Sequence, residues 1–380
     1  MKELRYELNF ATPAFLGNAE QQGQWRTPPI KALLRQWWRV AYAADHRFQV
    51  NVADMRREEG HLFGHAWLED DRDARGRKAA ARKSLVRIRL DRWDPGRLKD
   101  WQALATVSHP EVKFPVGSDL YMGYGPLRLP KGAKQPELKE NAAIQSGETA
   151  TLALAVPDEF TARVQRALAL MDRYGTLGGR SRNAWGSFGL IPQGETPSLE
   201  LQPALRDWNA ALNEDWPHAI GTDGEHRPLI WQSAAHDDWK ALMKTLAVVK
   251  IALRTQFTFP NAAPPHATPL PRHWLSYPIT RHGTQTFDRN ARLPNSLRFK
   301  VRPAADGKLV GVIVHVPCKP PAAFKPDIPA ITAMWERVHA LLDELARPTG
   351  ARRYESIKDN TRRETLEPGL NSVTLQRIPE

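Results

Sequence analysis

Residues 175–190 read GTLGGRSRNAWGSFGL and place five glycines and two arginines in one short stretch. Glycine tolerates positive φ and lets other atoms approach the backbone, so successive N–H groups of such a stretch can point at phosphate oxygens. Arginine adds charge and a planar face for stacking. The stretch lacks the GxxxxGK[ST] pattern and follows a helical segment, which excludes a P-loop. Two interpretations stay open: contact with phosphate or RNA, and a long turn that binds nothing.

The segments on either side of this stretch predict strands and helices in alternation. Apolar and polar residues alternate over 4–10, 84–90 and 149–156, which predicts half-buried strands, and a short strand follows the glycine-rich stretch. Apolar residues at helical spacing predict one helix after the first strand and another before residue 175. The resulting order is strand, helix, strand or strands, helix, strand, which fits a ferredoxin-like or RRM-like sheet with both helices on one face.

Signals at the ends of these two helices support their placement. Thr27 is expected to cap the first helix, with Pro28 at its first position, where the missing N–H costs nothing. Asp158 or Thr161 is expected to open the second helix, and Gly175 stands where a C-cap glycine belongs. The glycine-rich stretch therefore begins at a helix end.

The second half repeats this order without a visible sequence repeat. Strands are expected over 229–233, 297–301, 309–316 and 372–378, and helices over 237–255 and 331–346. We predict an α+β protein with two ferredoxin-like (RRM-like) domains and long loop insertions, of which 109–148 is one. The predicted boundaries are 1–192 for the N-terminal domain, 193–228 for a connector and 229–380 for the C-terminal domain.

The composition narrows the class of partner. Fifty-four Lys and Arg stand against 42 Asp and Glu, and the net charge of +12 favours a polyanion, usually nucleic acid. One cysteine, Cys318, excludes an internal disulfide framework and any cysteine-built metal site. The chain shows no apolar run long enough to span a bilayer and no signal-peptide pattern, so we expect a cytoplasmic protein without membrane contact.

The first predicted helix carries a second candidate for RNA contact. A basic helical face with an aromatic side chain can hold a phosphate backbone and stack a base. A solvated face is the alternative, and Trp37, by its spacing, is expected in the core. The candidate residues of this face are Arg26, Lys31, Arg35, Trp38 and Arg39.

Histidines suggest two further candidate sites, a metal site and a basic cluster in a loop. His61 and His65 have the i, i+4 spacing of metal ligands, but Gly64 argues against a stable helix and no third ligand is evident, so we expect no metal ion and no cofactor. A proline-rich loop groups basic residues that fit RNA contact, loop structure or the acid–base chemistry of a ribonuclease. These residues are Arg272, His273, Arg281 and His282, with Trp274 nearby.

Several stretches together resemble a known family. These are ATPAFLGNAEQQGQWRTPPIKALLRQWWRVAYA (11–43), HLFGHA (61–66), YGTLGGRSRNAWGSF (174–188), HWLSYPIT (273–280) and RLPNSLRFKV (292–301). They are similar to the RAMP superfamily of CRISPR effector subunits, which has a helix after its first strand and a C-terminal glycine-rich loop. Within that superfamily they most resemble subunit one of type III-B (Cmr) RNA-targeting complexes.

The resemblance implies two ferredoxin-like domains, no independent enzymatic role, and guide RNA (crRNA), target RNA and other RAMP subunits as partners. The cleaving subunits of such complexes carry an aspartate in the loop after the first strand, whereas residues 17–24 here offer only Glu20. The family's usual GSSLKG becomes TPPIKA at 27–32. Both departures argue against self-contained cleavage. The remaining candidate RNA-binding residues are Gly178, Gly179, Arg180, Ser181, Arg182, Asn183, Trp185, Arg292, Asn295, Arg298 and Lys300.

Three functions follow from these observations. The first is a non-catalytic RNA-binding subunit of a type III CRISPR effector complex, contacting the 3′ region of the guide and the target RNA in antiviral defence. The second is a metal-independent RAMP endoribonuclease that processes guide precursors with His273 or His282. The third is a generic two-domain RNA-binding scaffold outside CRISPR.

Overall fold

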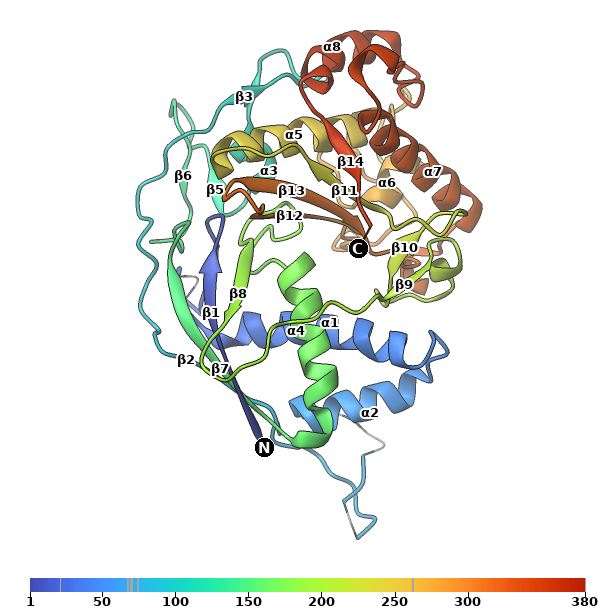
Figure 1. Ribbon diagram of the computed structural model, residues 1–380. Coiled ribbons are helices and arrows are strands. Elements are labelled where there is room, and N and C mark those ends of the chain that lie inside the picture. The colour runs from blue at the N-terminus through green and yellow to red at the C-terminus, as the bar shows by residue number, and fades with distance from the viewer. Residues whose placement is uncertain (21, 67, 69–70, 74, 262, 380) are drawn as a thin grey trace. The chain divides into compact units, whose positions relative to one another are not determined.

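The computed structural model describes the whole chain except residues 21, 67, 69, 70, 74, 262 and 380. It confirms an α+β protein built on antiparallel sheets (Figure 1). The chain divides into two compact units that are interleaved in sequence. The first unit contains 1–99, 140–179 and 186–204, and the second contains 100–139, 180–185 and 205–380. The predicted connector, 193–228, is thus shared between them, and the predicted insertion belongs largely to the second unit.

The first unit contains a four-stranded sheet in the order β2-β7-β1-β8. Its neighbouring strands are antiparallel, and inward-facing residues alternate with outward ones along β1 and β7 as predicted. The strands are β1 (Lys2–Phe10), β2 (Arg87–Leu90), β7 (Thr149–Val156) and β8 (Phe188–Pro192).

Two long helices of the first unit pack against each other (Figure 1). These are α1 (Thr27–Asp45) and α4 (Thr161–Tyr174), which follows a 3₁₀ turn, η1 (Asp158–Phe160). The rings of Trp37 and Tyr174 lie 6.0 Å apart between them, so Trp37 is in the core as predicted. The predicted cap of α1 is wrong by one residue, because Arg26 is the N-cap and makes no side-chain capping bond.

A third helix of this unit, α2 (Val52–Phe63), was not predicted. The Asn51 side chain caps it by accepting from the N–H groups of Ala53 and Asp54. Gly64 follows the helix rather than breaking it, with a φ of 78° that favours glycine. His61 therefore lies on a helix and His65 beyond its end.

Gly175 ends α4 as predicted, but not in the left-handed conformation of a C-cap glycine. Its φ is −84°. A Cβ at this position would lie 2.5 Å from the Met171 carbonyl oxygen and 3.0 Å from Trp37 Nε1. Close packing against α1, rather than backbone strain, therefore requires glycine here.

The second unit contains a four-stranded antiparallel sheet in the order β12-β13-β11-β14. In both four-stranded sheets, the strand that comes first in sequence thus lies between the third and the fourth strands of that sheet. The elements of this frame are β11 (Ile230–Ser233), α5 (Trp239–Thr255), β12 (Leu297–Pro303), β13 (Leu309–His315), α7 (Ile328–Leu345) and β14 (Leu375–Arg377). An unpredicted helix, α8 (Asn360–Asn371), precedes the last strand.

Shorter elements complete the second unit. Two helices, α3 (Ser118–Gly123) and α6 (Pro271–Leu275), each have fewer than two turns. The short strands form three pairs: β3 (Thr106–Val107) with β4 (Val116–Gly117), β5 (Leu127–Arg128) with β6 (Glu137–Leu138), and β9 (Leu205–Asp207) with β10 (Ile220–Thr222). Further 3₁₀ turns are η2 (Ala210–Asn213), η3 (Ala322–Phe324) and η4 (Thr349–Ala351). Among the residues that the structure describes, no helix is long and apolar enough to cross a membrane.

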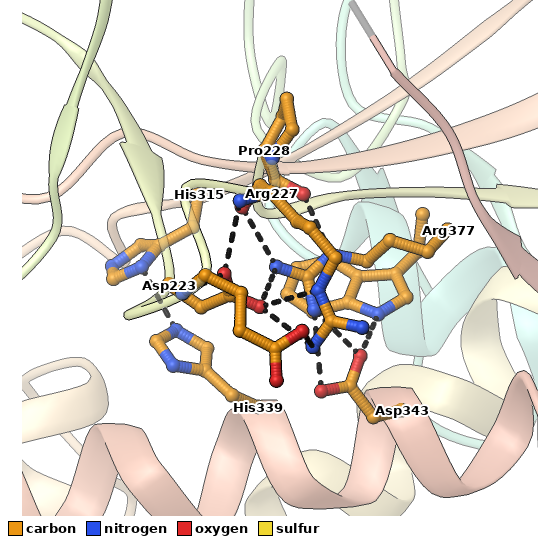
Figure 2. Close-up of polar contacts among 9 residues, drawn as sticks. Asp223, Arg227, Pro228, His315, His339, Asp343 and Arg377 are labelled. Atoms are coloured by element: carbon orange, nitrogen blue, oxygen red, sulfur yellow. Dashed lines mark hydrogen bonds and ion pairs between the residues drawn. The ribbon is translucent and has the colours of Figure 1, made fainter.

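A charged network joins the last strand to α7 (Figure 2). Arg377 Nη1 lies 3.0 Å from Asp343 Oδ1, and Arg377 Nη2 lies 3.1 Å from Asp223 Oδ2. Beside this network, His339 Nε2 and His315 Nδ1 are 3.0 Å apart inside the core. Burial and the nearby Arg377 charge lower the pKa of His339 to about 3, and burial lowers the pKa of His315 well below its ordinary value.

This histidine pair predicts acid sensitivity. Below about pH 6.5 the unfolded chain binds protons at both imidazoles while the folded chain does not. The free energy of unfolding should therefore fall by about 1.4 kcal/mol per pH unit for each histidine as the pH drops from about 6.5 towards 3. In His339→Gln the fall between pH 6 and 4 should be less steep, as measured by urea unfolding.

His226→Gln is the matched control, because the His226 side chain is exposed. It should keep the wild-type slope. An equal slope in wild type and His339→Gln would show that this imidazole takes up its proton in the folded chain too.

Candidate nucleic-acid interface

The tip of the glycine-rich stretch, 180–185, is built into the second unit. The Phe299 N–H donates to the Arg182 carbonyl oxygen at 3.2 Å, and Asn183 forms a parallel bridge with Phe299. The Asn183 amide also donates to the Met122 carbonyl oxygen at 2.7 Å. The tip thus extends the edge of the sheet next to β12.

Trp185 anchors the tip in an aromatic cluster. Its ring lies 5.5 Å from that of Trp101 and 5.9 Å from that of Trp239, and its side chain is fully buried. A Cβ on Gly123 would lie 3.0 Å from Trp185 Nε1. Trp185, proposed from the sequence as an RNA contact, therefore presents no face to a base in this conformation.

The base of the glycine-rich stretch lies in the first unit, and its amides are bonded to protein. The Gly179 N–H donates to the Phe15 carbonyl oxygen at 2.9 Å, and the Gly186 N–H donates to the Pro13 carbonyl oxygen at 2.8 Å. Gly178 has a φ of 91°, and a Cβ there would lie 2.6 Å from the Phe15 oxygen. At these positions the glycines serve a tight turn, so the N–H groups of Gly179 and Gly186 are not open to a phosphate.

The two arginines of the tip are held by carbonyl groups. Arg180 is exposed, and its Nε donates to the Tyr124 carbonyl oxygen at 2.6 Å. Arg182 Nη1 donates to the Asn295 carbonyl oxygen at 2.8 Å. A carbonyl carries no full charge, so these contacts orient the guanidinium groups without neutralising them.

Arg182 lines a cavity of about 150 Å³ in the second unit, together with Asn295 and Arg298. Burial and the nearby Arg182 charge lower the pKa of Arg298. A cavity of this size can hold one benzene-sized ring. Other lining residues include Trp274, Arg292 and Cys318, whose thiol pKa is raised by burial. The cavity thus gathers five residues singled out from the sequence: Arg182, Trp274, Arg292, Asn295 and Arg298. Lys300, further along β12, is fully buried and does not line it.

The basic set on α1 lies in the first unit and shares one carboxylate. Arg35 Nε donates to Glu59 Oε1 at 2.8 Å, and Arg39 Nε donates to Glu59 Oε2 at 2.9 Å. Both guanidinium groups remain about one-third exposed, at 31% and 37%, whereas Glu59 is buried. Two arginines against one carboxylate leave one positive charge on this face.

The other members of the α1 set divide between surface and core. Burial and the Arg35 charge lower the pKa of Lys31. Arg26 donates to the Gly17 carbonyl oxygen. Trp38 is fully buried, with its ring 5.9 Å from that of Phe63 in an edge-on arrangement. Trp38 is therefore part of the core and not a stacking surface in this conformation.

The proline-rich loop brings its basic residues together in the second unit. His273 is fully buried, and both ring nitrogens are used: Nδ1 accepts from the Leu270 N–H at 2.9 Å, and Nε2 lies 2.9 Å from the His282 carbonyl oxygen. His282 is partly exposed and stacks on Phe259 with ring centroids 3.8 Å apart. Burial and the neighbouring His266 lower the pKa of His282.

His61 and His65 meet at one carboxylate that the sequence analysis did not assign to them. Their Nε2 atoms lie 2.9 and 2.6 Å from the two oxygens of Asp71, and Arg82 donates to the same carboxylate. The four side chains thus form one internal network around the Asp71–Arg82 ion pair. Within the described part of the chain, no group of three or more His, Cys, Asp or Glu side chains is arranged to hold a metal ion.

The sequence analysis missed basic residues that lie on helices of the second unit. Arg254 of α5 and Arg362 of α8 line one recess with Arg272, Arg281 and His282. Arg254 lies in the last turn of α5, where a basic residue is common because it interacts favourably with the helix dipole. Arg362 lies in the unpredicted α8. Neither position carried a sequence signal that linked it to the loop.

Several solved structures are similar to the chain, among them the following two. No protein-family model and no curated protein matches the chain. The apo crystal structure of Cmr1 from Pyrococcus furiosus is similar, with 14% identity and a TM-score of 0.41, over 83% of this chain and 88% of that one. The cryo-EM structure of the Type III-B Cmr-beta bound to cognate target RNA contains a similar chain, with 12% identity and a TM-score of 0.41, over 90% of this chain and 99% of that one. At this level of likeness neither structure assigns a ligand or an activity to this chain.

The buried position of Trp185 leads to a test of its role. Trp185→Ala removes a fully buried ring, and the free energy of unfolding should fall by about 3–5 kcal/mol. Urea unfolding of the full chain measures this change. An exposed stacking residue would instead leave the unfolding free energy within about 0.5 kcal/mol of wild type.

Proposed function

We propose that this chain is a non-catalytic, RNA-binding RAMP subunit of a type III-B CRISPR effector complex, acting in the cytoplasm in antiviral defence. The single observation that carries the proposal is the cavity that joins Arg182 to Asn295 and Arg298. These residues come from the glycine-rich stretch and from 292–301, two of the stretches that carry the family resemblance. Segments more than 100 residues apart thus build one basic site.

The topology supports the family part of the proposal. In each unit the sheet places the fourth strand beside the first, then the third and the second, with one helix after the first strand and another after the third. We propose that both units are ferredoxin-like on this ground. The helices of this pattern are α1 and α4 in the first unit, and α5 and α7 in the second.

The chemistry of the cavity suits one unstacked base of an RNA strand with its phosphate. Proteins read single-stranded RNA mainly through splayed bases held by aromatic and guanidinium planes and by polar edges. The cavity offers the Trp274 ring, the Arg182 guanidinium and the Asn295 side chain. Its volume of about 150 Å³ admits one ring and not a base pair.

The identity of the RNA and of the protein partners is inferred from the resemblance of residues 11–43, 61–66 and 174–188 to the RAMP superfamily. We propose that the RNA is the 3′ region of the guide together with the target, and that other RAMP subunits bind this chain. The surplus of twelve positive charges agrees with a polyanionic ligand. The partly exposed Arg35 and Arg39 pair on α1 adds positive charge in the first unit.

The endoribonuclease alternative receives less support than RNA binding without cleavage. General acid–base cleavage needs two groups free to exchange protons at the scissile bond. His273 is enclosed, and both of its ring nitrogens have backbone partners. That leaves His282 as the accessible histidine of the predicted pair.

Salt titration of RNA binding tests the proposed site. In Arg182→Met the affinity of the full chain for a single-stranded RNA should fall about tenfold, because one guanidinium contact to a base or phosphate is lost. The affinity of wild type should fall steeply with salt. Arg289→Met is the control, since it removes an exposed arginine of the same unit that does not line the cavity.

Equal affinities of wild type and Arg182→Met would remove the cavity from the RNA site. Purification from the native cell tests the assembly separately: paralogous RAMP subunits and a discrete guide RNA should accompany the chain. A 2′,3′-cyclic phosphate product from repeat RNA and the purified chain would instead establish the endoribonuclease.

A further inference from the structure

A recess of about 570 Å³ in the second unit is lined by arginines from four separate segments. Arg254 comes from α5, Arg272 from α6, Arg281 from the loop after α6 and Arg362 from α8. We call this site the arginine recess. Its cations converge although their segments are far apart in sequence.

The arginine recess contains more positive charge than its own carboxylate neutralises. Glu111, the acidic residue that lines it, accepts from Arg272 Nη1 and Arg362 Nη1, each at 2.6 Å. Burial alone would raise the pKa of Glu111, but the two arginines outweigh burial and lower it to about 2, so the carboxylate is ionised. Arg362 Nε also lies 3.6 Å from Asp359 Oδ2, so four guanidinium groups against two carboxylates leave a surplus of two charges.

The remaining two arginines lack an acidic partner. Among the residues that the structure describes, no carboxylate lies within 4 Å of Arg254 or Arg281. The Nε atoms of Arg254 and Arg272 are buried without a hydrogen-bond partner in that same described part. A buried donor without a partner costs free energy, and an oxyanion entering the recess can supply that partner.

A buried lysine beside the recess responds to the same positive charge. Lys250 lies one turn before Arg254 on α5, and its ammonium is 5.5 Å from the centre of the Tyr121 ring. Burial, followed by the charges of Arg254 and Arg180, holds the pKa of Lys250 well below its ordinary value. Repulsion among the arginines destabilises the empty site, and a bound anion relieves it.

One wall of the arginine recess is aromatic. Phe259 and His282 stack within 6° of parallel, and the Arg272 guanidinium lies 5.3 Å from the Phe259 ring centre. Both rings line the recess. Stacked rings beside a cluster of arginines suit a nucleotide. Its base or ribose would contact the rings, and its phosphate would contact the arginines.

We propose that the arginine recess binds a phosphate group of RNA. Guanidinium forks match the geometry of phosphate oxygens, and a surplus of two charges is more than one further carboxylate would neutralise. That the phosphate belongs to RNA rests on the proposed function, whereas the phosphate chemistry rests on the recess alone. The phosphate is either internal to the strand or at its end.

Thermal unfolding of the full chain in sodium phosphate, compared with sodium chloride of equal ionic strength, tests the phosphate chemistry. Wild type should unfold about 2 °C or more higher in phosphate, because the anion binds the folded chain. Arg254→Met should lose most of this shift, and in chloride it should unfold no lower than wild type, because repulsion with Arg272 is relieved. Arg289→Met, exposed and outside the recess, should keep the wild-type shift.

The absence of a phosphate shift in wild type, or an equal shift in Arg254→Met, would overturn the proposal. If Arg254→Met does not fold, Arg281→Met replaces it, since the Arg281 side chain is exposed. There the same loss of the phosphate shift is expected, and an intact shift would count against the recess.

RNA binding separates this inference from the proposed function. Short RNAs with a terminal phosphate and with terminal hydroxyl groups distinguish the two sources. A several-fold preference for the phosphorylated end that disappears in Arg254→Met identifies a strand end, and equal weakening of both RNAs identifies an internal phosphate. A phosphate shift without any RNA binding would support the recess and remove the proposed function. RNA binding that is unaffected in both Arg254→Met and Arg281→Met would support the proposed function and overturn RNA contact at the recess.

Discussion

The backbone pairing between the loop tip and β12 fixes the proposed RNA site. The Phe299 N–H bonds to the Arg182 carbonyl oxygen, and the Arg182 guanidinium reaches back to the Asn295 carbonyl oxygen. These two bonds set the register of the tip against the strand. A slip of one residue would reverse which side chains face the cavity, because neighbouring residues of an extended chain point to opposite sides. Ring contacts of Trp185 with Trp101 and Trp239 further fix the position of the tip.

In two places a pair of arginines shares a single carboxylate. Arg35 and Arg39 share Glu59, and Arg272 and Arg362 share Glu111, so each carboxylate holds two guanidinium groups and neutralises one. This arrangement keeps long side chains ordered while part of their charge remains available. Pre-ordered cations lose less rotational freedom when an anion binds, which favours affinity.

Sequence periodicity predicted the elements whose burial is one-sided. The alternation in β1 and β7 and the apolar stripes of α1, α4, α5 and α7 were predicted within a few residues. The helices α2 and α8 were missed because their polar residues outweigh a narrow apolar side, and α8 contains Pro368. Of the candidate site, the structure shows that Arg182, Asn295 and Arg298 line one cavity, and their contact with RNA stays a prediction.

What the sequence could not show was which aromatic residues are enclosed by distant segments. Trp185 is covered by Trp101 and Trp239, and Trp38 by Phe63, and such partners far along the chain leave no trace in local spacing. The glycine-rich stretch was ambiguous for a similar reason. Its amides bond to Pro13 and Phe15, which are more than 160 residues away.

The interleaving of the two units governs how the chain can fold during synthesis. Residues 100–139 leave the ribosome before β7 and β8 have completed the first sheet, yet α5, against which α3 and β3 pack, follows about 100 residues later. The first unit can fold once residue 204 has emerged from the ribosome. At that point residues 100–139 and 180–185 are still without the partners that they have in the second unit. Neither unit can be cut out as one continuous fragment, so a truncation near residue 192 would strip the second unit of the tip that carries Arg182.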